Sequence, residues 1–95
     1  MTEPSSRFAA TVVGRPEVAA LVLEATPDMG ATLVRYTAGR ETAGDIWYGS
    51  ADEAQSCAAR DYGAALGAWH PIPDAEADPA AFALRADPDS SVGSE

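Results

Sequence analysis

The sequence predicts an α+β fold: a three-stranded antiparallel meander, one helix packed across it, and a short aromatic return edge segment. Three observations lead to this prediction. Apolar residues alternate over 17–25 and 31–38, with the period of strands. A short aromatic run at 45–48 follows, and Gly49 and Ser50 then end the strand and start a helix. Because strands that follow one another along the chain usually lie side by side, these three most simply form a meander.

The first predicted strand has two apolar faces of unequal strength. Ala19, Leu21, Leu23 and Ala25 form the stronger face, and Val18, Ala20, Val22 and Glu24 form the weaker one. A turn follows, in which Pro27 presets φ and Gly30 permits a positive φ. The second hairpin loop, 39–44, has a glycine at each end.

Residues 1–16 are predicted to be a mobile arm, with an edge strand as the alternative. The first seven residues are polar and interrupted by Pro4, whereas 8–13 form an apolar run closed by Gly14. Both alternatives stay open at this point. The domain itself is expected over 17–73.

The helix is predicted to begin after Ser50 and to run from 51 to 65. Ser50 and Glu53 form a Ser-x-x-Glu capping box, and acidic residues in the first turn complement the helix dipole. Gly67 is the expected stop. The expected inner stripe consists of small residues followed by an aromatic end: Ala54, Cys57 or Ala58, Asp61 or Tyr62, and Ala65.

Two prolines restrict the segment 68–73 to the edge of a sheet, because proline cannot donate to a strand ladder. From 74 to 95 the acidic residues outnumber a single Arg85, and prolines, serines and glycines complete the composition of a disordered tail. One apolar island, 82–84, interrupts this tail. It either folds back onto the domain or serves as a docking motif.

The charge balance restricts the kinds of partner. The chain has 15 acidic and 6 basic residues, all of the latter Arg, and a net charge of −9. Such a charge opposes binding to nucleic acids and to anionic membranes, and it suits a basic protein partner. Cys57 is the only cysteine, which excludes an internal disulfide and multi-cysteine metal sites. We expect no cofactor, a cytoplasmic location, and a monomer or weak homodimer.

The motifs around the helix start resemble those of a set of small bacterial proteins. Their pattern runs Gly-Asp-Thr-Trp-His, a Ser-x-x-Glu-Ala helix start, an acidic-aromatic-Gly helix end, and Trp followed by Val/Ile-Pro. The resemblance covers about residues 17–73 and departs at Ile46 and Tyr48. It implies a fold and a boundary but no activity. The matching residues are Gly44, Asp45, Trp47, Ser50, Glu53, Ala54, Asp61, Tyr62, Gly63, Trp69, Ile72 and Pro73.

The order of strands, turn and Glu-Ala helix start is also similar to that of HicB-like antitoxin domains. This second resemblance implies a partial ribonuclease-H-like fold.

Two tryptophans and one histidine are the candidates for function. Trp47 and Trp69 are predicted to pack between sheet and helix, with an exposed aromatic anchor for a partner as the alternative. His70 is a candidate general base oriented by Asp45 or Asp61, with an ordinary loop histidine as the alternative.

The other candidates have structural interpretations. Cys57 is expected to be an inert thiol unless Arg60 lies beside it. Asp52 and Glu53 serve the helix cap, and no metal site is expected.

The sequence therefore favours a small acidic, non-enzymatic interaction or regulatory module that binds through Tyr48, Trp69 and His70. The alternative is a small enzyme or ligand-binding domain that uses His70 with Asp45 or Asp61. A concave pocket lined by these three residues would favour the enzyme.

Overall fold

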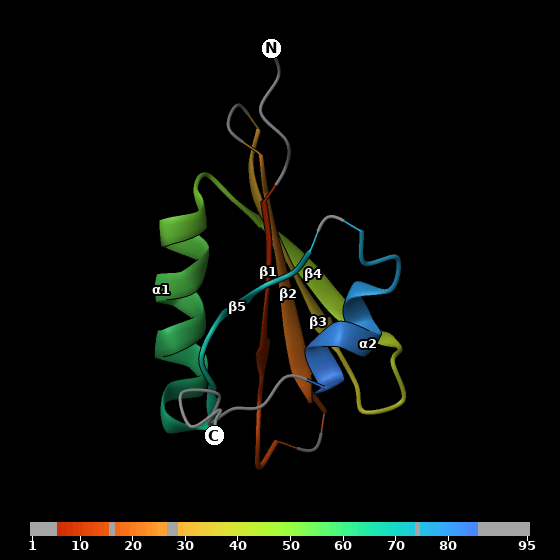
Figure 1. Cartoon of the computed structure of the whole chain (residues 1–95). Helices are drawn as coiled ribbons and strands as arrows, with labels where there is room; N and C mark the ends of the chain where they lie inside the picture. The colour runs from red at the N-terminus through yellow and green to blue at the C-terminus, as the bar shows by residue number, and fades with distance from the viewer. Residues whose placement is uncertain (1–5, 16, 27–28, 74, 86–95) are drawn as a thin grey trace.

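The protein is a five-stranded antiparallel sheet with one helix on each side (Figure 1). The computed structural model describes residues 6–15, 17–26, 29–73 and 75–85. Across the sheet the strands follow the order β4-β3-β2-β1-β5. The elements are β1 Ser6–Thr11, β2 Ala20–Thr26, β3 Gly30–Tyr36, β4 Thr42–Tyr48, α1 Ala51–Tyr62, the 3-10 turn Gly63–Ala65, β5 His70–Pro71 and α2 Pro79–Arg85. The predicted α+β class and the antiparallel meander are confirmed.

β1 is an interior strand. It pairs with β2 on one side, with Phe8 opposite Leu23, and with β5 on the other, with Ala9 opposite His70. Ala9 and Ala10 are completely buried. Residues 6–11 are therefore a strand, as the alternative prediction had it, and not a mobile arm. The strand lies inside the sheet rather than at its edge, because β5 pairs with its outer side. Residues 1–5 and 16 lie outside the described residues.

Both faces of the central strand β2 are buried, so the sheet has two cores. The core on the α1 side includes Val12, Val18, Leu21, Leu23, Ala31, Leu33, Ala54 and Ala58. The core on the other side is smaller and consists of Ala9, Ala20, Val22, Ile72 and Ala83. The two predicted faces are found within β2, and Ala20 and Val22 of the weaker face are also covered. Val18, predicted on that weaker face, precedes the strand and packs in the core on the α1 side instead.

The start of α1 agrees with the prediction from the sequence, and its end does not. The backbone N–H of Glu53 donates to the hydroxyl of Ser50 at 3.1 Å, and the Glu53 carboxylate accepts from the N–H of Gly49 at 3.2 Å. The helix ends at Tyr62, because Gly63 adopts φ 53° and its N–H donates to the carbonyl of Ala59. Gly63 rather than Gly67 is therefore the stop.

The segment after α1 returns along the edge of the sheet, as predicted. Val12 forms an isolated antiparallel bridge with Leu66, and His70 and Pro71 pair with β1. Leu66 and Trp69 pack against the core on the α1 side. The predicted packing role of Trp69 is thus confirmed.

A second helix, α2, lies in the segment that was predicted to be a disordered tail. Asp78 caps it by accepting from the N–H of Ala81 at 3.1 Å, and Pro79 is its first residue. Ala80 and Ala83 are buried, and Phe82 packs on the smaller core. The prediction of a disordered tail was wrong for 75–85, because tertiary contacts, rather than composition, stabilise this short helix. Of the two alternatives for the apolar island 82–84, the structure shows that it folds back onto the domain. Residues 74 and 86–95 lie outside the described residues.

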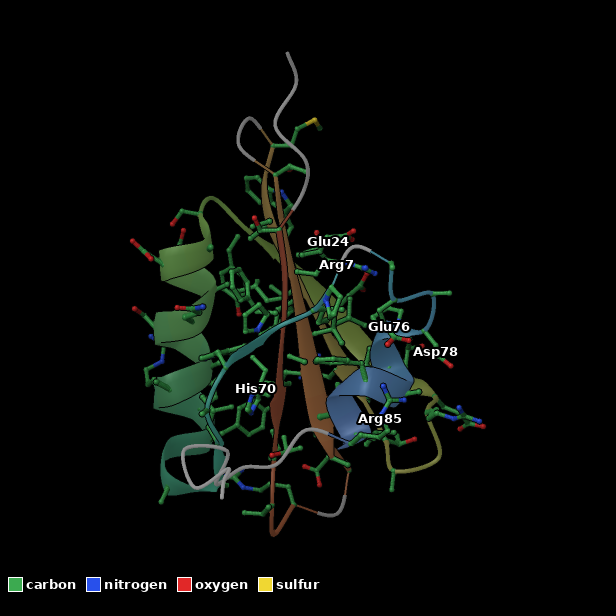
Figure 2. All side chains as sticks on the ribbon, in the orientation of Figure 1. Arg7, Glu24, His70, Glu76, Asp78 and Arg85 are labelled. Carbon is green, nitrogen blue, oxygen red and sulfur yellow. The ribbon has the colours of Figure 1, made fainter. Side chains whose placement is uncertain are left out.

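Arg7 connects β1 to the segment before α2. Its Nη2 donates to the carbonyl of Pro73 at 2.7 Å and to that of Glu76 at 3.1 Å. The Glu76 carboxylate lies 3.4 Å from Nη2 of Arg85 at the end of α2 (Figure 2). These contacts position the helix on β1 and β2.

Removing residues 75–95 should therefore destabilise the protein. The deletion uncovers the smaller core, and we expect a loss of about 3 kcal/mol, which corresponds to more than about 10 °C in Tm for a domain of this size. A chain ending at Arg85 is the matched control and should keep nearly all of its stability. Equal Tm values for both truncations, measured by circular dichroism, would contradict the docking of α2.

Candidate interaction surface

The edge strand β4 is the most exposed regular element of the sheet. Trp47 is 63% exposed and Ile46 is 42% exposed. Trp47 therefore does not pack in the core, contrary to the prediction, and Ile46 is buried only in part. Alternation along the strand correctly indicates a sheet, but it does not reveal whether a helix covers the face on which a side chain lies.

The Trp47 ring is held in place by the β2–β3 turn. Its Nε1 donates to the carbonyl of Met29 at 2.7 Å. The ring lies against Gly30, where an added Cβ would come within 2.7 Å of the ring atom Cζ2. Gly30 also has φ 81°, which favours glycine. Only glycine fits this contact, and the ring presents an ordered apolar surface to solvent.

The register of the sheet shows which side chains share a face with Trp47. Trp47 is paired with Thr32 and Asp45 with Val34. These four residues lie on the α2 side, because Leu33 and Ala31, which alternate with them, pack on the α1 side. α2 contacts β1 and β2. Thr32, Val34, Asp45 and Trp47 thus lie on the part of this face beyond the strands that α2 contacts, and we call them the open sheet face. Asp45 and Trp47 are exposed, and Thr32 and Val34 are partly buried.

Carboxylates lie on and beside the open sheet face, and arginines accompany two of them. Asp45 lies on the face. Glu24 of β2 is paired in register with Thr32 on one side and with Arg7 on the other, and the Asp78 carboxylate lies 3.5 Å from Nη1 of Arg40. Burial raises the pKa of Tyr36, and the nearby carboxylates of Asp78 and Glu24 raise it further. Asp45 itself forms no ion pair within the described residues.

The α1 side of β4 carries a polar cluster. Burial raises the pKa of Tyr48. Cys57, which also forms a hydrogen bond with Tyr48, and Asp61 raise this pKa further, whereas Arg35 lowers it. Nη2 of Arg60 lies 3.6 Å from Sγ of Cys57. Arg60 therefore lies beside the Cys57 thiol, as the prediction of a reactive cysteine requires. No group of metal-binding side chains accompanies the pair in the described residues.

The sequence-predicted site residues do not form one pocket. Asp45 is on the edge strand β4 and His70 is on the opposite edge strand β5, with three strands between them. At about 4.8 Å per strand their backbones are about 19 Å apart, which excludes a hydrogen-bonded dyad. Asp61 lies near the end of α1, 3.7 Å from Nε of Arg60, and its pairing with His70 stays a prediction.

The predicted binding residues are likewise divided between the two edges. Tyr48 belongs to β4, whereas Trp69 and His70 lie at or next to β5. The exposure of Trp47 and Ile46, on opposite faces of β4, and of Met29 before β3 was not predicted. Only the alternative interpretation of Trp47 as an exposed aromatic anchor indicated this exposure.

Comparisons of the chain with protein-family models, curated proteins and solved structures gave no match, so function has to be inferred from the surface itself. Within the described residues, no group of three or more His, Cys, Asp or Glu residues could hold a metal ion. No helix in that part of the chain has the length and hydropathy needed to cross a membrane.

The tyrosine pKa values predict a loss of stability at alkaline pH. The folded-state pKa values of Tyr48 and Tyr36 are raised above 10.0, so the native state retains protons that the unfolded state loses. Their contribution is therefore fully present below pH 10 and is lost as the pH rises through the folded-state values. Urea unfolding at increasing alkaline pH should show this decline, with a shallower slope for Tyr48→Phe. An unchanged slope would contradict the assignment.

Proposed function

We propose that the protein is a small acidic, cytoplasmic, non-enzymatic interaction module that binds a protein partner along β4. The observation that carries this proposal is the exposed ring of Trp47 on the edge strand β4, whose outer side pairs with no strand among the described residues. A hydrogen bond from the ring to the carbonyl of Met29 holds it in place. Ordered aromatic side chains are the residues that most often dominate binding energy at protein interfaces.

The backbone of β4 supports the proposal. An edge strand has unpaired N–H and C=O groups, and natural proteins usually protect such an edge with prolines, lysines or short strands. β4 is seven residues long, contains no proline or lysine, and has one charged side chain, Asp45. A bulge at its start, where Arg35 faces Gly44 and Tyr36 faces Thr42, protects only that end.

The opposite edge of the sheet provides an internal comparison. β5 contains two residues, one of them Pro71, and Pro73 follows shortly after. This edge has the protection that β4 lacks. The asymmetry favours β4 as the site at which an extended partner segment adds to the sheet, a common mode of peptide recognition.

Site-specific photo-crosslinking in the source organism tests this function. A photoreactive amino acid is placed at the exposed Ala43 of β4 or, as the matched control, at the exposed Ala59 of α1. We expect a discrete crosslinked protein from position 43, weakened when Trp47→Ala is added, and none from position 59. The same product from both positions, or a product unaffected by Trp47→Ala, would contradict a β4 interface.

A further inference from the structure

We infer that the segment bound by β4 is an extended strand in which basic and aliphatic residues alternate. This inference rests on the proposed function and specifies the chemistry of its partner. It follows from the side chains that the two faces of β4 present and from the charges around them.

The two faces of β4 differ in chemistry. Asp45 and Trp47 lie on the α2 side, within the open sheet face, whereas Ile46 and Tyr48 lie on the α1 side. A strand added beside β4 has the same alternation, so its residues face these two sets in turn. A residue beside Asp45 and Trp47 meets a carboxylate and an aromatic ring, and a residue beside Ile46 meets an aliphatic side chain.

An arginine or lysine fits the first environment. Asp45 has no ion pair within the part of the chain that the structure describes. A guanidinium group can pair with this carboxylate and stack on the adjacent indole ring, which is the best cation–π acceptor among the side chains. An aliphatic residue fits the second environment because it covers Ile46, which is 42% exposed.

Charge selects a basic partner over the other occupants. A second copy of the chain would bring another charge of −9 to the edge, which opposes its binding. The chain's own segment 86–95 contains Asp87, Asp89 and Glu95 and no basic residue, so it also lacks the required charge. A basic segment, in contrast, is attracted to Asp45 on β4 and to a chain whose net charge is −9.

Titration of the full-length protein with three synthetic hexapeptides tests the inference, with backbone amide NMR shifts as the readout. The first alternates Arg and Val, the second has three Arg followed by three Val, and the third alternates Glu and Val. We expect the alternating Arg–Val peptide to shift the amides of β4 and to bind more tightly than the other two. Asp45→Asn should weaken this binding about two- to five-fold, as for an exposed ion pair. Glu17→Gln, an equal charge change at an exposed site outside β4, should not.

Each of the other outcomes would contradict a specific part of the inference. Equal binding of the two Arg–Val peptides would show that only net charge matters and would overturn the alternation. Tighter binding of the Glu–Val peptide with shifts in β4 would overturn the basic partner and leave the β4 interface intact. A dimer in solution that Ile46→Lys converts to a monomer would identify a second copy as the occupant. Absence of any shift in β4 would overturn the inference, and the crosslinking experiment would still decide the proposed function separately.

Discussion

Two helices have to cover the two faces of a sheet that is wider than either of them. A helix with its side chains is about 10 Å across, roughly the width of two strands, whereas β4 and β5 are about 19 Å apart. On one face α1 covers β2 to β4, and the return segment with Leu66 and Trp69 adds to that core. On the other face α2 covers β1 and β2, and Tyr36 at the end of β3 packs against the same core, whereas Asp45 and Trp47 of β4 are exposed. The open sheet face is the consequence of this shortfall.

The features that the sequence reveals are those that depend on neighbouring residues. The Ser50–Glu53 cap lies within four residues, and the alternation along β2 and β3 is visible directly. The position of β1 depends on β5, about sixty residues later, and so was not predictable. α2 is stabilised by the smaller core, and Arg7 holds the segment that precedes it, neither of which composition shows.

The candidate site was predictable only in part, for the same reason. Tyr48 and Trp47 belong to one strand, and the sequence identified both as residues of interest. Their side chains point to opposite faces, and only the position of the short helix α2 decides that Trp47 is the exposed one. His70 and Asp45 pair with strands on opposite sides of the sheet, a separation that no local motif reports.

Trp47 has a structural role, which explains part of its environment. The indole N–H satisfies the carbonyl of Met29, and one edge of the ring fills the space left by Gly30. This role requires the N–H and that edge, and it leaves most of the ring in water. Exposed aromatic area is unfavourable in a free protein, but a ring already held in one position loses little conformational entropy when a partner covers it. The contact of Trp47 with Met29 and Gly30 is thus the same contact that prepares β4 for binding.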